Sequence, residues 1–169
     1  MNKNKLTSPV GDVQCLDSHG RRYTFPADRY IDRIAIYGLH LTNSSILMVL
    51  DSQSKKWEFP GGGLEINETE EDCLSREFQE ETGLIPVTKG MQFLYSYISH
   101  FYDTCSSSPW RTVRKFYIIS EVSGTTLKDG NGTDTAKVDY LPIERINRVI
   151  MSKEVRHVID LACLKLSVS

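Results

Sequence analysis

The alternation of apolar and polar residues along the chain predicts a protein built mainly from β-strands. Short alternating runs at 13–16 and 22–25 flank the polar stretch Asp17–Gly20, which is the pattern of a hairpin. The longest polar stretch, 123–137, is rich in Gly, Asp and Thr and is expected to be a surface loop. Longer apolar runs predict further strands at 33–41, 46–50, 57–59, 90–102, 112–122 and 138–141.

A helical pattern replaces this alternation at 70–82, where apolar residues recur four positions apart. Thr69 is a suitable N-cap for this helix, with Asp72 three residues later in the manner of a capping box. Gly83 stands where a left-handed residue commonly ends a helix. Further helices are predicted at 142–148, beginning with a proline, and at 152–166, capped by a serine.

A strand-rich order with one central and one terminal helix predicts an α+β fold, an α/β/α sandwich around a mixed β-sheet. A chain of 169 residues suits one domain. We therefore expect a flexible N-terminal tail at 1–12 and a single domain at 13–169. Within it, the hairpin at 13–30 would be an N-terminal extension that either pairs with a second subunit, as in a homodimer, or covers a sheet edge.

The composition narrows the range of partners. The 20 Lys and Arg residues nearly balance 22 Asp and Glu residues, so no basic field favours a nucleic-acid polymer. The four cysteines are scattered, which argues against a disulfide framework and against structural zinc. The N-terminus lacks an apolar signal region and no apolar run suits a membrane span, so we expect a cytoplasmic protein without membrane contact.

The central helix carries Glu77, Glu80 and Glu81 at positions i, i+3 and i+4, so their side chains share one face. They lie in the C-terminal half of the helix, where the helix dipole disfavours negative charge and neighbouring carboxylates repel. Carboxylate oxygens at this spacing suit Mg²⁺ or Mn²⁺. On the helix alone, a solvated acidic face remains the favoured interpretation.

The residues before the helix change that balance. Three glycines at 61–63 allow the backbone to approach a ligand closely. The chain then reads Gly62, five residues, Glu68, seven residues and Arg76-Glu77-Phe78-Gln79-Glu80-Glu81-Thr82-Gly83-Leu84. This stretch resembles the Nudix box, G-x5-E-x7-R-E-U-x-E-E-x-G-U, in which U is a bulky apolar residue. Every fixed position matches, and the preceding Trp57-Glu-Phe-Pro-Gly is typical of the MutT-like branch of the Nudix hydrolases.

The resemblance implies a Nudix-type fold and a metal-dependent catalytic site. Glu77, Glu80 and Glu81 would be catalytic residues that bind Mg²⁺ or Mn²⁺, with the carbonyl of Gly62 as a further metal ligand. Glu81, or a carboxylate from a later loop, would be the general base.

The resemblance implies that the remaining fixed positions of the box are structural. Arg76 would be catalytic only by orienting the helix and its glutamates through ion pairs, with Glu68 as its partner. Gly83 would end the helix.

The reaction implied is hydrolysis of a pyrophosphate linkage in a nucleoside diphosphate joined to another group, most simply a nucleoside triphosphate or a related nucleotide. The alternative is a non-catalytic Nudix domain that senses a nucleotide and acts through a protein partner. The complete set of box glutamates favours the enzyme.

Substrate choice must come from residues outside the box. Tyr97 and Trp110 are candidates for stacking on a base, although aromatic residues in strands more often pack against the sheet. Asp134, in the polar loop, is a candidate late carboxylate. A basic cluster at Arg111, Arg114 and Lys115 is a further candidate for phosphate contact, although a solvated strand end is the favoured interpretation of it.

Overall fold

A computed structural model describes residues 11–167 of the chain, so most of the predicted tail at 1–12 lies outside the described residues. Two compact units are distinguished. The first contains the described residues up to Arg33 together with Ile98–Val113, and the second contains Ile34–Tyr97 and the chain from Arg114 onward. The unit boundaries fall inside three long strands, β3 (Ile31–His40), β8 (Gln92–Asp103) and β9 (Ser108–Ile119).

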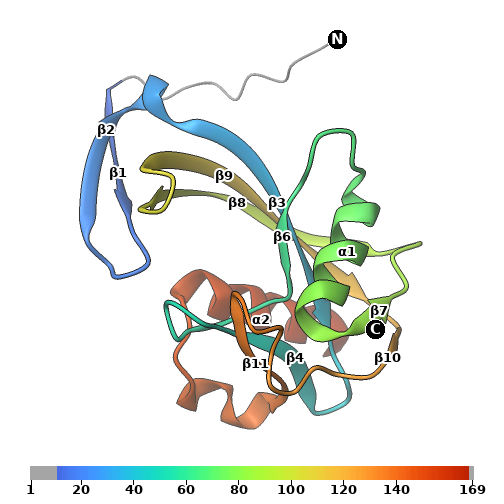
Figure 1. The fold of residues 1–169 in the computed structure, drawn as a ribbon. Coiled ribbons are helices and arrows are strands. Elements are labelled where there is room, and N and C mark those ends of the chain that lie inside the picture. The colour runs from blue at the N-terminus through green and yellow to red at the C-terminus, as the bar shows by residue number, and fades with distance from the viewer. Residues whose placement is uncertain (1–10, 168–169) are drawn as a thin grey trace. The chain divides into compact units, whose positions relative to one another are not determined.

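The first unit contains the predicted hairpin. Strands β1 (Asp12–Leu16) and β2 (Arg22–Pro26) pair in antiparallel fashion (Figure 1), and the 3-10 helix η1 (Ala27–Arg29) follows. The carboxylate of Asp17 closes the turn by accepting the backbone N–H groups of His19 and Arg21, both at 2.9 Å. The strand order in this unit is β2-β1-β8-β9-β3, with β1 parallel to β8.

The second unit contains the two α-helices, a 3-10 helix and the remaining strands. Its strands form three sheet segments. The long strands continue in the order β8-β9-β3-β6, a second sheet has the order β11-β4-β5, and β7 pairs with β10. These added strands are β4 (Ser45–Asp51), β5 (Trp57–Glu58), β6 (Gly61–Gly63), β7 (Leu84–Pro86), β10 (Val122–Gly124) and β11 (Thr135–Pro142). The helices are α1 (Glu70–Thr82), the 3-10 helix η2 (Ile143–Arg148) and α2 (Lys153–Ser167).

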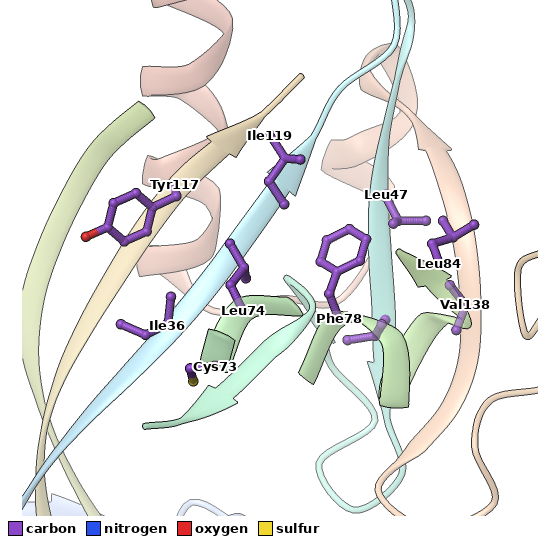
Figure 2. Packing of buried hydrophobic residues seen from close by; sticks show 10 residues of the cluster. Ile36, Leu47, Cys73, Leu74, Phe78, Leu84, Tyr117, Ile119 and Val138 are labelled. Carbon is purple, nitrogen blue, oxygen red and sulfur yellow. The ribbon is translucent and has the colours of Figure 1, made fainter. Parts of the chain in front are cut away.

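Helix α1 occupies the predicted residues and has the predicted ends. The side chain of Thr69 accepts the backbone N–H of Asp72 at 3.1 Å, and Gly83 has the left-handed φ of 74°. The buried face of the helix presents Leu74 and Phe78 to the sheet, as Figure 2 shows. The cluster that they join contains Ile36, Leu47, Val49, Cys73, Leu84, Tyr117, Ile119 and Val138. Burying one such large side chain stabilises the fold by about 1.5–3 kcal/mol.

Helix α2 packs against the other face of the strands. Ser152 caps it, because its hydroxyl accepts the N–H of Val155 at 3.1 Å. On β3 the side chain of Ile36 belongs to the α1 cluster and that of Leu39 to the α2 cluster, and side chains an odd number of positions apart on a strand point to opposite faces. The α+β fold with a mixed sheet between a central and a C-terminal helix is therefore confirmed.

The three glycines at 61–63, to which the sequence pattern assigns no strand, form one in the structure. The three glycines form β6, which pairs with β3 so that Gly61 is opposite Tyr37 and Gly63 opposite Ala35. Gly61 has a φ of 145°, and a Cβ built on it would lie 2.1 Å from the carbonyl oxygen of Ile36. The strand therefore depends on glycine, and its lack of side chains concealed it from a pattern of apolar residues.

The polar stretch 123–137 also contains more β-strand than predicted. It begins within β10 and ends within β11, which starts at Thr135 rather than at 138. Strand β9 likewise begins at Ser108, earlier than the predicted 112. Within 11–167, no helix is long and apolar enough to cross a membrane.

Candidate active site

The three glutamates of α1 have different surroundings. Glu81 is partly buried, and its Oε2 accepts the backbone N–H of Gly61 at 2.8 Å. The hydroxyl of Thr135 donates to the other oxygen of Glu81 at 3.5 Å. The side chain of Glu77 is 17% exposed, whereas that of Glu80 is 59% exposed. Of the three glutamates predicted to share one helix face, Glu77 and Glu81 are therefore partly buried, whereas Glu80 is exposed to solvent.

Burial makes the charges of the two inner glutamates costly. It raises the pKa of Glu81 to about 8, with the charges of Asp134 and Glu77 raising it further and the Gly61 hydrogen bond opposing the rise. Burial also raises the pKa of Glu77, and the charges of Glu80 and Asp134 add to the effect while Arg76 opposes it. The site therefore brings several carboxylates together where burial makes their negative charge costly.

Arg76 connects the helix to the preceding loop. Its Nε and Nη2 donate to the two carboxylate oxygens of Glu68 at 2.8 and 3.0 Å, and Nη2 also donates to the carbonyl of Gly63 at 3.1 Å. Its Nη1 lies 2.8 Å from Glu77 and 3.5 Å from Glu80. Hydrogen bonding to Arg76 lowers the pKa of Glu68 to about 2. Arg76 and Glu68 therefore form the ion pair that the box predicts.

Gly62 gives the inner carboxylate room. A Cβ built on Gly62 would lie 2.5 Å from the carboxyl carbon of Glu77, which is too close for any real contact. The carbonyl of Gly62 accepts a weak hydrogen bond from the Cys73 thiol at 3.8 Å. Glycine at this position therefore brings the backbone and the carboxylate of Glu77 together.

The donor set fits a hard divalent cation by its chemistry, because it consists of carboxylate and carbonyl oxygens. Their arrangement shows why no cluster of three or more His, Cys, Asp or Glu side chains stands ready to hold a metal within residues 11–167. Arg76 draws Glu77 and Glu80 toward its guanidinium, and Gly61 holds an oxygen of Glu81. A cation at this site would add to the positive charge that Arg76 supplies to Glu77 and Glu80.

Asp134 lies just before β11, and its charge reaches both inner glutamates. Burial alone would raise its pKa, but hydrogen bonds from Asn131 and Thr133 outweigh burial and lower it. The Asn131 amide donates to Asp134 at 2.7 Å. Asp134 is therefore an ionised carboxylate from a later loop that acts electrostatically on Glu77 and Glu81.

The two aromatic candidates are in different units. Trp110 belongs to the first unit, where the guanidinium of Arg33 lies 5.4 Å from its ring centre. Tyr97 belongs to the second unit and stacks on Phe116 with ring centres 5.7 Å apart. Tyr97 also lines a shallow cavity of about 250 Å³, whose other lining residues are Tyr95, Lys153, Glu154 and His157.

The interpretation of the basic cluster as a solvated strand end was wrong. The side chain of Arg111 is 6% exposed and pairs with Asp32. Lys115 pairs with Glu70 at 2.5 Å, at the start of α1. Arg114 also has a carboxylate partner. Sequence reasoning missed these partners, and it missed the cavity residues of α2, because no local spacing connects them to the box.

Comparison with known proteins places this fold and box in a family. The model of the NUDIX domain family matches residues 31–161. The chain therefore belongs to the Nudix family, and the match begins after the hairpin of β1 and β2. It is a Nudix hydrolase.

Two characterised relatives match over different lengths. The chain is 27% identical over 137 residues to the ADP-ribose pyrophosphatase of Methanocaldococcus jannaschii, which covers 79% of this chain and 72% of the relative. It is 68% identical to the 8-oxo-dGTP diphosphatase of Proteus vulgaris, but over only 28 residues, which are 17% of this chain and 25% of the relative.

Solved structures of MutT and Nudix proteins share the fold. A MutT protein from Bacillus halodurans superposes with a TM-score of 0.63 at 16% identity, covering 76% of this chain and 80% of that protein. The NUDIX domain of NrtR from Shewanella oneidensis, solved with ADP-ribose, gives a TM-score of 0.57 at 16% identity, covering 81% and 88%. At these identities the likeness concerns the fold.

Proposed function

We propose that the protein hydrolyses the pyrophosphate linkage of a nucleoside diphosphate joined to another group, in the presence of Mg²⁺ or Mn²⁺. The observation that carries the proposal is the pair of partly buried carboxylates, Glu77 and Glu81, which share one face of α1 beside the backbone of Gly61 and Gly62. A divalent cation in this site would supply positive charge to phosphate oxygens and would make the attacking water more acidic. Glu77, Glu80, Glu81 and the Gly62 carbonyl are the proposed metal ligands.

The chain's own residues then orient the reaction. Arg76 holds the loop of Glu68 against α1, so that the Gly62 backbone stays beside Glu77. The proton of the attacking water goes to a carboxylate, for which Glu81 and Asp134 are the two candidates. Hydrogen bonds outweigh burial and lower the pKa of Asp134, whereas burial raises the pKa of Glu81 to about 8.

The choice of substrate candidates rests on how much of this chain each relative matches. The match to an ADP-ribose pyrophosphatase spans 79% of the chain, which supports ADP-ribose as a substrate. The short match to an 8-oxo-dGTP diphosphatase supports a nucleoside triphosphate as the second candidate. Tyr97 is the proposed contact for the nucleoside, because it lines the cavity of the second unit. For Trp110, only its aromatic ring supports a role in nucleoside binding. The cytoplasmic setting and the homodimer remain predictions.

A substrate screen tests the proposal. Purified protein would be incubated with ADP-ribose, the common nucleoside triphosphates, 8-oxo-dGTP and nucleotide sugars, each with Mg²⁺ and with Mn²⁺. We expect hydrolysis of one class, strongly reduced in Glu81→Gln and unchanged in Glu71→Gln, an exposed glutamate in the first turn of the same helix. Binding of a nucleotide without hydrolysis would contradict the proposal and favour the sensing alternative.

A further inference from the structure

Arg114 has surroundings that the Nudix box does not explain. It lies on β9 with only 18% of its side chain exposed, and its guanidinium lies 4.3 Å from the ring centre of Tyr37. Its Nη1 donates to the hydroxyl of Tyr97 at 3.2 Å, and its Nη2 donates to Glu58 at 3.1 Å. A planar guanidinium with two directed hydrogen bonds holds both partners in one plane, which lysine does not do.

Fold stability is a poor explanation for this ion pair. The Nε of Arg114 is buried and finds no hydrogen-bond partner among the described residues, so the group is not fully satisfied. Removing charges from water is costly, and apolar residues often replace a buried ion pair without loss of stability. An arginine that is buried, charged and incompletely bonded is therefore better explained by what it positions.

The two partners of Arg114 reach different parts of the second unit. Tyr97 lines the cavity of about 250 Å³. Glu58 ends β5, three residues before Gly61, whose N–H donates to Glu81. Arg114 therefore bonds on one side to a wall of the cavity and on the other to the strand that leads into the box.

The cavity suits the ring of a nucleoside. Its volume is below the ~300–1,000 Å³ usual for sites that enclose a whole ligand, so it accommodates a part of the substrate. Tyr95 and Tyr97 supply aromatic surface, and His157 meets Tyr95 edge-on with ring centres 5.2 Å apart. Glu154 and Lys153 add an acceptor and a donor at the start of α2.

We propose that Arg114 is a positioning residue for substrate binding: oriented by Glu58, it holds the Tyr97 hydroxyl in place at the wall of a cavity that takes the nucleoside ring. This inference rests on the proposed function and extends it, because it assigns nucleoside affinity to a buried ion pair outside the box. Arg114 does not touch the reacting phosphates in this account. Its loss therefore changes nucleoside affinity more than the rate of the chemical step.

Titration calorimetry in Mg²⁺ tests this with three probes: AMP, GMP and inorganic pyrophosphate. For Arg114→Met we expect nucleoside monophosphate affinity to fall at least about tenfold, the size expected for losing a hydrogen bond to a charged group. Pyrophosphate affinity should stay within about twofold, because it carries no ring. Arg114→Lys should be intermediate, since it keeps the charge and loses the fork.

Two further variants separate positioning from folding. Tyr97→Phe removes only the hydroxyl and leaves the Arg114–Glu58 pair, and we expect it to raise KM with kcat within about threefold. The double variant Tyr97→Phe with Arg114→Met should bind nucleoside monophosphates no more weakly than Arg114→Met alone, because each single change already removes the Arg114–Tyr97 hydrogen bond. Lys115→Gln is the matched control: it breaks a neighbouring ion pair of β9 and should lower the melting temperature without changing KM.

The outcomes separate this inference from the proposed function. If the wild-type enzyme hydrolyses nucleotides but Arg114→Met and Tyr97→Phe bind AMP and GMP as tightly as wild type, the inference is overturned and the function stands. Failure of AMP and GMP to bind the wild-type protein also overturns it. Nucleoside-specific loss of affinity in Arg114→Met supports it even if the hydrolysed substrate proves different from those screened.

Discussion

The box region and the cavity region of the second unit assemble their residues in opposite ways. The box takes its carboxylates, its arginine and its glycines from one continuous stretch, 57–84, in which β5, β6 and α1 follow each other directly. The cavity collects Tyr95 and Tyr97 from β8 and its charged residues from α2, more than fifty positions later. The residues proposed for catalysis are thus close together in the sequence. The residues proposed for nucleoside recognition are far apart in the sequence, and only the folded structure brings them together.

The largest effect should come from the box carboxylates. We expect Glu81→Gln to lower kcat by at least about 100-fold, the usual contribution of a group that handles the proton or its metal. Asp134→Asn should lower kcat by about 10–100-fold if Asp134 only adjusts its neighbours, and by as much as Glu81→Gln if it is the base. Steady-state kinetics with the substrate found in the screen measures both, and unchanged kcat in both variants would contradict the proton-transfer role given to these two carboxylates.

A substitution on the buried face of α1 gives a comparison with the box glutamates of the same helix. Phe78→Ala should destabilise the protein by about 3–5 kcal/mol, because Phe78 is fully buried in the α1 cluster. Urea unfolding followed by circular dichroism measures this. The box variant Glu81→Gln should not share this loss, since it removes a charge that burial disfavours. Equal destabilisation of the two variants would mean that Glu81 serves the fold rather than the site.

Gly62→Ala should affect activity more than folding. The added Cβ would meet the carboxyl group of Glu77 at 2.5 Å, and the flexible side chain of Glu77 must then move away from β6. We expect kcat/KM to fall by about tenfold or more, as for other small displacements of catalytic groups. Gly132→Ala, where a Cβ meets nothing within 4 Å, is a spatial control measured beside it, although its φ of 79° adds strain. A fully active Gly62→Ala enzyme would show that Glu77 need not lie against β6.

The smallest effect concerns the ion pair that connects loop and helix. Glu68 has its pKa lowered to about 2 from an ordinary value of 4.5, so it binds a proton more readily in the unfolded chain than in the folded one. Its stabilising contribution is complete above pH 4.5 and is lost as the pH falls from there toward 2. Chemical unfolding between pH 6 and 3 should show a steeper loss for wild type than for Glu68→Gln, and parallel curves would contradict the role given to Arg76.

The same contrast explains how much of the structure could be predicted from the sequence. Helix α1 was predicted with its observed ends because Thr69, Asp72 and Gly83 are local signals that agree. Strand β6 was missed because glycines carry no side-chain alternation, and β7 and β10 were missed because three residues are too few to form a pattern.

The candidate site divides along the same line. The resemblance to the Nudix box implied the pairing of Arg76 with Glu68, and the structure shows that pair, because an arginine and a carboxylate joined by one short loop have few other arrangements. Spacing gave no indication of Glu58 with Arg114, whose 56-residue separation is closed only by the pairing of strands. It also gave no reason to prefer Tyr97 over Trp110, because the unit to which each belongs depends on the tertiary fold.

The central claim is that the partly buried carboxylates of α1 bind a divalent cation, and thermal unfolding with and without Mg²⁺ tests it most directly. At 100 times its dissociation constant, an ion that binds only the native state adds about 2.7 kcal/mol, or roughly 5–10 °C in Tm for a chain of this size. We expect this rise in the wild-type protein and in Glu71→Gln, and its loss in Glu77→Gln. A wild-type Tm that does not respond to Mg²⁺ or Mn²⁺, or an equal rise in Glu77→Gln, would contradict the account.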